Sequence, residues 1–201
     1  DMVAKGHLAA SCDSCAHGTD TTHCYFHLGP EFRWARLSAG TVPPEIASAS
    51  GFRERFYRDR PITPVQTARL FEGLLEESED NGFPFAVVRL DSVRQQNGGL
   101  YAKIDLDRGR FITFDSVLVR GNARVSQRYL RSQIGISPGD PYNEALVDGT
   151  NARLRELPFI TIKRAPYVLF TADETKLYLF LDAKKASSFN GILGVAPDAV
   201  T

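Results

Sequence analysis

Hydrophobic and polar residues follow each other along the last part of the chain in a pattern that predicts strands around two helices. One β-rich run covers residues 111–119, and two more cover 160–173 and 176–185, joined by a polar turn. Between the first run and the other two, Ser126 and Asn143 each precede a helical pattern, and their side chains can accept hydrogen bonds from the first turn. The predicted order is strand, helix, helix, strand, strand.

The same order occurs upstream, so the chain contains an internal repeat. The upstream elements are a strand at 32–40, a helix start at 43–50, a helix at 62–82 with Thr63 as its cap, and a hairpin of 85–93 and 100–107. Leu100, Tyr101 and Asp105 in one copy match Leu177, Tyr178 and Asp182 in the other. The fold class is therefore α+β, with tandem β-α-α-β-β domains that each hold a three-stranded mixed sheet covered by two helices on one face.

Each long helix shows an apolar face on a helical wheel. In the first helix this face holds Ala68, Phe71, Leu75 and Gly82, and in the second it holds Tyr142, Ala145, Leu146, Gly149 and Leu157, with Leu154 at its edge. Arg153 lies inside the second face and needs a polar partner. We attribute Gly149 to a close approach of neighbouring backbone.

Composition supports a globular chain with two small domains. The sequence has 201 residues, of which 43% are hydrophobic and 24% charged. Lys plus Arg and Asp plus Glu both number 24, so nothing indicates the basic stripe expected of a nucleic-acid partner. No stretch approaches the roughly 18 apolar residues of a spanning helix.

An incomplete third copy opens the chain. Residues 5–15 parallel 81–93, with Gly6 in the place of Gly82, and residues 24–32 parallel 100–111. Only the end of a helix and a hairpin of this copy are present. We expect this remnant to pack against the next repeat or to fray.

The repeated order, the turn "GISPGDPYN" and the strand "FDSVLVRGN" resemble POTRA (polypeptide-transport-associated) domains of the BamA and TamA kind of outer-membrane assembly factor. The resemblance runs from Phe32 onward. It is specific for the last repeat and looser for the earlier one, where "DRPITPVQ" stands in place of the Gly-Asp-Pro-Tyr-Asn pattern.

The resemblance implies a domain organisation for the whole chain. Residues 1–30 are the C-terminal remnant of a preceding POTRA-like domain, and 31–109 and 110–186 are two complete ones. Residues 187–201 are the start of a C-terminal barrel strand or a tail, because members of this family pass from their last POTRA domain into a membrane barrel.

A sheet covered on one face keeps an edge strand whose backbone can pair with an extended peptide. In the resembled family this edge is the strand after the second helix, which implies two peptide-binding stretches here. They are Ala86, Val87, Val88, Arg89, Leu90, Asp91, Ser92 and Val93, and Arg164, Ala165, Tyr167, Val168, Leu169 and Phe170. Pro166 removes one donor from the second stretch, so the first is the better receptor.

Three cysteines near the N-terminus raise a competing interpretation. Cys12, Cys15 and Cys24, with nearby histidines, have the ligand types of a zinc site or a redox pair. A regular strand, however, points Cys12 and Cys15 to opposite faces. A hairpin centred near residues 19–20 sets Cys15 opposite Cys24, where the two can form a disulfide in an oxidising compartment and leave Cys12 free. We expect no metal.

The resemblance implies a non-enzymatic module without cofactor on the periplasmic side of the bacterial outer membrane. It would receive unfolded outer-membrane or secreted polypeptides by β-strand addition and pass them to its own C-terminal barrel, with accessory assembly lipoproteins as further partners and no nucleic acid. The close alternative is the POTRA region of a two-partner secretion transporter. A zinc or redox module is the distant alternative, and a third is a spacer whose edges bind nothing.

Overall fold

The computed structural model describes residues 2–184 and divides the chain into two compact units. The first unit runs to Phe114 and includes 139–146, and the second comprises 115–138 and the chain from 147 onward. The barrel strand or tail expected at 187–201 lies outside the described residues. The domain boundaries expected from the sequence stay a prediction.

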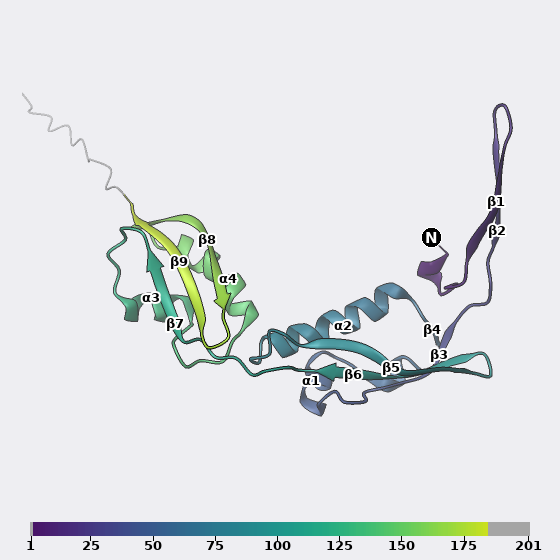
Figure 1. Cartoon of the computed structure of the whole chain (residues 1–201), viewed down its shortest axis with the longest axis horizontal. Helices are drawn as coiled ribbons and strands as arrows, with labels where there is room; N and C mark the ends of the chain where they lie inside the picture. The colour runs from purple at the N-terminus through teal and green to yellow at the C-terminus, as the bar shows by residue number, and fades with distance from the viewer. Residues whose placement is uncertain (1, 185–201) are drawn as a thin grey trace, which may run out of the picture. The chain divides into compact units, whose positions relative to one another are not determined.

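The described elements follow the predicted order in both repeats (Figure 1). In the first unit they are η1 (Val3–Lys5), β1 (Ser11–His17), β2 (Thr22–His27), β3 (Arg33–Ser38), α1 (Pro44–Ala49), η2 (Glu54–Phe56), β4 (Arg60–Pro61), α2 (Pro64–Glu79), β5 (Val87–Gln96) and β6 (Gly99–Asp107). The elements that follow are β7 (Ser116–Arg120), α3 (Gln127–Ile134), α4 (Glu144–Arg155), β8 (Ile160–Phe170) and β9 (Thr175–Ala183).

The main sheet of the first unit is mixed, with the strand order β4-β3-β6-β5. β3 runs parallel to β6, whereas β4 and β5 run antiparallel to their neighbours. The sequence predicted three strands. The fourth, β4, is only two residues long and pairs with the start of β3. Both α1 and α2 contribute to one core, in which Ile46 and Leu74 are buried with Trp34, Leu37 and Ile104.

The sheet of the second unit has the order β7-β9-β8, with β7 parallel and β8 antiparallel to β9. Residues alternate along β9, so Leu177, Leu179 and Leu181 are fully buried. The buried Leu130 of α3 and Leu154 of α4 lie on the helix side of the unit, and Figure 1 shows both helices on one face of the sheet. The α+β class with two helices on one face is therefore confirmed.

The predicted caps form, but the predicted helix faces are rotated. Thr63, Ser126 and Asn143 each accept a hydrogen bond from a backbone N–H three residues later. The residues that α2 and α4 bury are Leu70, Leu74 and Ser78, and Thr150 and Leu154, while Ala68 and Ala145 are exposed. Gly82, Tyr142 and Leu157, which the helical wheel also placed on these faces, lie beyond the helix ends and are buried there.

Arg153 has the polar partner expected from its position on the helix, and the absence of a side chain at Gly149 leaves space for its guanidinium. The guanidinium Nη1 donates to the backbone oxygen of Ile134 at 2.9 Å. The three atoms nearest to a Cβ at Gly149 would all belong to the Arg153 guanidinium, the closest at 2.9 Å. The expectation that Gly149 serves a close backbone approach is therefore wrong, since the space is filled by a side chain of the same helix.

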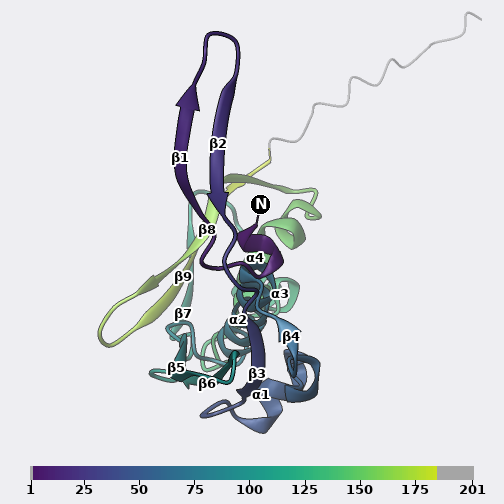
Figure 2. The ribbon, with the colours of Figure 1, turned by 90° about the vertical axis from the view of Figure 1, so that its right-hand side faces the viewer.

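The remnant at the N-terminus forms a hairpin of its own. β1 and β2 pair only with each other, and every residue in them is exposed (Figure 2). Gly6 and Gly82 correspond as the repeat predicts: both have left-handed φ, 94° and 92°. The Gly6 oxygen accepts from the N–H of Phe32 at 2.9 Å, and the Gly82 oxygen accepts from the N–H of Ile112 at 2.8 Å.

Among the helices of the described residues, none has the length and apolar character needed to cross a membrane.

Candidate peptide-binding edges and cysteine cluster

β5 is the last strand in the sheet of the first unit and β8 the last in the sheet of the second. Each pairs antiparallel with one neighbour, β6 or β9, and within residues 2–184 no strand pairs with its other side. One row of backbone N–H and C=O groups in each strand is therefore directed away from the sheet, which is the geometry required for adding a strand.

The regular part of β5 is shorter than the stretch expected from the sequence. Pairing with β6 is continuous from Val87 to Asp91 and then shifts register before Arg94. Ser92 lies in this irregularity with a left-handed φ of 53°. Because a bulge breaks the ladder, an added strand can pair continuously only with Val87–Asp91. Val88 and Leu90 pack against the core, and Val87 is 55% exposed on the other face.

β8 is the more irregular edge. Its register shifts twice, between Ile162 and Arg164 and again between Arg164 and Tyr167, and Pro166 lies inside the second shift. Pairing with β9 is then continuous from Tyr167 to Phe170. A proline donates no backbone hydrogen bond, so the longest continuous edge of β8 is these four residues.

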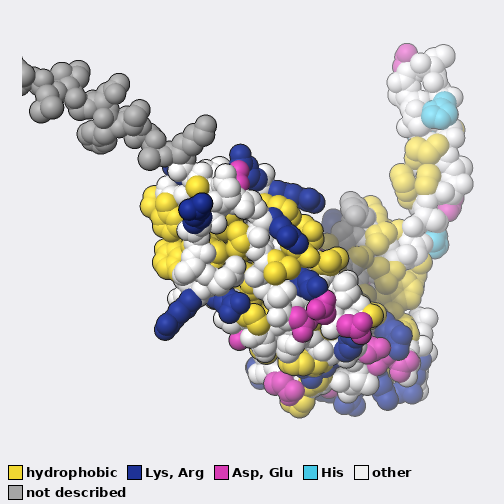
Figure 3. All heavy atoms as spheres, turned by 60° about the vertical axis from the view of Figure 1, so that its left-hand side comes forward, with side chains coloured by type: hydrophobic (Ala, Val, Ile, Leu, Met, Phe, Trp, Pro, Cys, Tyr) yellow, Lys and Arg dark blue, Asp and Glu magenta, His cyan; other side chains and the backbone are white. Residues whose placement is uncertain are grey.

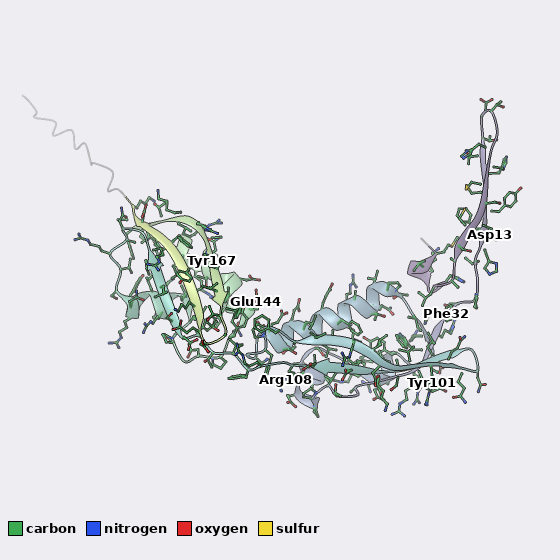
Figure 4. The ribbon with its side chains drawn as sticks, viewed as in Figure 1. Asp13, Phe32, Tyr101, Arg108, Glu144 and Tyr167 are labelled. Carbon is green, nitrogen blue, oxygen red and sulfur yellow. A yellow bond between two sulfur atoms is a disulfide. The ribbon has the colours of Figure 1, made fainter. Side chains whose placement is uncertain are left out.

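Aromatic and cationic side chains cover the sheet face beside β8. The Tyr167 ring stacks on Tyr178 at 5.3 Å and on Phe180 at 5.7 Å between centroids. Arg164 lies 5.2 Å above the Tyr167 ring and Arg120 lies 5.6 Å above Tyr178. Figure 3 shows hydrophobic side chains mixed with Lys and Arg on this unit, and Figure 4 labels Tyr167 on its strand.

One carboxylate anchors the outer face of β5. Asp105 of β6 accepts from the Thr41 hydroxyl at 3.0 Å and from Arg89 Nε at 2.8 Å, with a second Arg89 nitrogen at 2.6 Å. The hydrogen bond from Thr41, followed by that from Arg89, lowers the pKa of Asp105 below its usual range. Arg89 is thus tied to Asp105 on the neighbouring strand β6.

The fourteen residues expected to bind peptide lie on two separate strands. Thirteen are in β5 or β8, and Ala86 directly precedes β5. The structure does not test whether they bind peptide. β8 also extends over Ile160–Lys163, which the sequence predicted as strand but did not include in the peptide-binding stretch. β5 extends over Arg94–Gln96, where the polar side chains give no strand signal in the sequence.

The cysteines lie together in the hairpin. Cys15 and Cys24 form a disulfide, with their Cα atoms 4.1 Å apart, and Cys12 is free and exposed. The expectation that Cys12 and Cys15 face opposite ways is wrong, because the register shifts between Cys12 and Ser14 and returns Cys12 to the face of Cys15. All three sulfurs lie within 4.8 Å of one another, but the disulfide occupies two of them and leaves one thiol as a metal ligand.

The fold defines a class of tandem β-α-α-β-β modules, and comparison with known proteins gives the family. Residues 112–178 match the model of the POTRA family, described as a surface antigen variable number repeat. This is the repeat whose turn and strand carried the resemblance in sequence. The segment is a POTRA domain.

Two solved structures extend the comparison to the rest of the chain. The Haemophilus influenzae BamA fragment POTRA3-5 is 15% identical, with a TM-score of 0.57, over 92% of this chain and 76% of that one. BamA from Haemophilus ducreyi lacking POTRA domains 1-3 is also 15% identical, with a TM-score of 0.52, over 74% of this chain and 27% of that one. A search of curated protein sequences gave no match.

The chain thus has the tandem POTRA fold of BamA, and this confirms the resemblance seen in the sequence. POTRA domains are non-enzymatic, chaperone-like modules, and the chain is accordingly not an enzyme. It spans about a quarter of the H. ducreyi BamA chain, 27%, so the activity of a whole protein is a matter for proposal.

Proposed function

We propose that this chain is a polypeptide-binding part of an outer-membrane protein assembly factor, on the periplasmic side of the membrane. It receives extended clients by β-strand addition at β5 and β8 and passes them to a membrane barrel. The POTRA match and the BamA structures support this class of function. Accessory assembly lipoproteins are further partners in the proposal.

The observation that carries the proposal is the free outer side of β5. Its longest continuous ladder covers Val87–Asp91, whereas the longest one in β8 covers Tyr167–Phe170. Backbone pairing is tolerant of side-chain sequence, which suits a module that handles many unfolded clients. β5 is therefore the primary receptor, and β8 is the secondary one.

The test is an amide NMR titration of the chain with an unstructured peptide from a strand of an outer-membrane barrel protein. We expect shifts in Val87–Asp91 first and in Tyr167–Phe170 at higher peptide concentration. A peptide of the same sequence with alternate backbone nitrogens methylated is the matched control, because it keeps the side chains and loses one row of donors.

Three outcomes separate the alternatives. Loss of the shifts with the methylated peptide supports strand addition. Equal shifts with both peptides, or shifts confined to α2, would mean that clients bind through side chains. No shift at millimolar peptide would favour a spacer, and binding of a single dedicated client among many would favour two-partner secretion.

A further inference from the structure

The hairpin holds a thiol against a disulfide. The Sγ atoms of Cys12 and Cys15 are 3.6 Å apart, and Cys15 is bonded to Cys24. Two sulfurs at this distance are in van der Waals contact. We name these three residues the cysteine cluster.

The contact depends on a bulge at Asp13, which Figure 4 labels in β1. Cys12 pairs with Phe26, Ser14 with Tyr25 and Cys15 with Cys24, so Asp13 has no cross-strand partner in the register. In a regular strand, residues three positions apart point to opposite faces. The extra residue restores Cys12 to the face of the disulfide, and without it the thiol would lie on the other side of the ribbon.

The cysteine cluster is open to other molecules. Every residue of β1 and β2 is exposed, and the hairpin pairs with no other described strand. Histidines flank the cluster, and Figure 3 shows them on the ribbon beside hydrophobic side chains. Nothing in residues 2–184 shields the sulfurs from an incoming thiol or disulfide. A buried structural disulfide would be inert by comparison.

We propose that the cysteine cluster is a thiol–disulfide exchange site, in which the disulfide moves between two positions and the released thiol captures polypeptides that carry a disulfide. The Cys12 thiolate attacks Sγ of Cys15, the Cys15–Cys24 bond breaks, and Cys24 leaves as a thiolate. The proton that Cys12 loses to water is replaced by one that Cys24 takes up. One disulfide and one thiol are present before and after, so the step needs no oxidant.

The exchange also changes how the two strands of the hairpin are linked. The Cys15–Cys24 bond joins β1 to β2, whereas a Cys12–Cys15 bond lies within β1 alone. The thiol therefore moves from one strand to the other, and the covalent link across the ribbon is lost. A client disulfide attacked by either thiol forms a mixed disulfide with the hairpin and releases a client thiolate. This site does not depend on peptide capture at β5 or β8.

The experiment maps the free thiol in the whole chain, purified without reductant and without added metal. The protein is held at pH 8 with oxidised glutathione, stopped with acid at intervals and digested with an acid-active protease without reduction. Mass spectrometry then locates the glutathione adduct and the disulfide. We expect adducts on both Cys12 and Cys24, increasing with pH as thiolate forms.

Two variants give the controls. In Cys12→Ser with Ser11→Cys, the thiol keeps its strand and exposure but moves to the opposite face of β1, and we expect about tenfold less migration to Cys24. In Cys24→Ser, we expect glutathione to be expelled and a Cys12–Cys15 disulfide to form.

Adducts confined to Cys12 over hours, with equal behaviour of the displaced-thiol variant, would overturn the proposal. A reduced chain that carries zinc at one ion per molecule would overturn it as well, since three free thiolates would then be ligands.

Discussion

Asp105 and Asp182 make equivalent contacts in the two repeats. Each lies on an inner strand of its sheet and binds a residue shortly after the first strand of its repeat: Asp105 accepts from the Thr41 hydroxyl, and Asp182 accepts from the Asn122 N–H at 3.0 Å. Each also binds a cation from the edge strand, Arg89 in β5 or Lys163 in β8 at 3.4 Å. The repeat noticed in the sequence therefore preserves a contact as well as an order of elements.

The pH dependence of stability tests the Asp105 contact. The folded-state pKa of Asp105 is lowered, so its ionised form stabilises the fold above the ordinary carboxyl pKa of about 4, and this contribution is lost as pH falls through the lowered value. We expect Asp105→Asn to reduce the free energy of unfolding more at pH 7 than at pH 2, measured by urea denaturation. Asp20→Asn in the hairpin turn controls for the loss of one charge, and an equal pH profile for both variants would contradict the assignment.

A glycine directly precedes Thr41 and another precedes Asn122. Replacing it tests how closely the backbone at this position approaches the last strand of the repeat. Gly40 and Gly121 have φ of 58° and 118°, and a Cβ would overlap the backbone oxygen of Ile104 or Leu181. We expect Gly40→Ala to lower the free energy of unfolding by on the order of 3 kcal/mol. Gly98→Ala is the control, since Gly98 has a similar φ of 78° but open space around it. A loss no greater than that of the control would show that the chain relaxes around the added methyl.

Restoring a backbone N–H donor in β8 tests whether Pro166 limits the affinity of this strand for a peptide. Pro166→Ala adds a backbone N–H next to the ladder at Tyr167–Phe170. We expect the affinity of a strand peptide for β8 to rise about threefold, as one further hydrogen bond allows, with binding at β5 unchanged. The readout is the concentration dependence of amide shifts in each strand. Unchanged affinity at β8 would mean that the register shifts, and not the missing donor, limit pairing.

Removing the disulfide tests how far the hairpin depends on it. We expect Cys15→Ser with Cys24→Ser to abolish amide protection in β1 and β2, because an isolated two-stranded ribbon is marginal in water. The main sheets share no strand with the hairpin, so their protection should persist. Hydrogen exchange measured by NMR gives both results in one experiment, and retained protection in the hairpin would show that strand pairing alone holds it.

The order of elements and the caps could be predicted because each follows from local chemistry, whereas the edge positions were implied by the resemblance to POTRA domains. Thr63, Ser126 and Asn143 cap their helices through short side chains, and the hairpin turn at Asn97-Gly98 takes the positive φ that these residue types favour.

Features that depend on one extra residue or on a distant partner were missed. The bulge at Asp13 reverses the facing of Cys12, and nothing in residues 11–17 marks it, since a bulge forms only against a paired strand. The helix faces were rotated because the wheel counted apolar residues, whereas the buried faces include the polar Ser78 and Thr150. The contact between Gly149 and the Arg153 side chain could not be predicted from the sequence, because a helical glycine has several explanations.

The contacts of Asp105 and Asp182 also imply a sequence of events when the chain first folds. Thr41 and Asp105 are separated by 64 positions, and Asn122 and Asp182 by 60. When the chain is synthesised from its N-terminus, the residue after the first strand of each repeat cannot make its hydrogen bond to the aspartate until the last strand of that repeat has been added. Each repeat therefore forms this contact only when all its strands are present. In a chain arrested midway through a repeat, the first strand of that repeat would lack the hydrogen bond to Asp105 or Asp182.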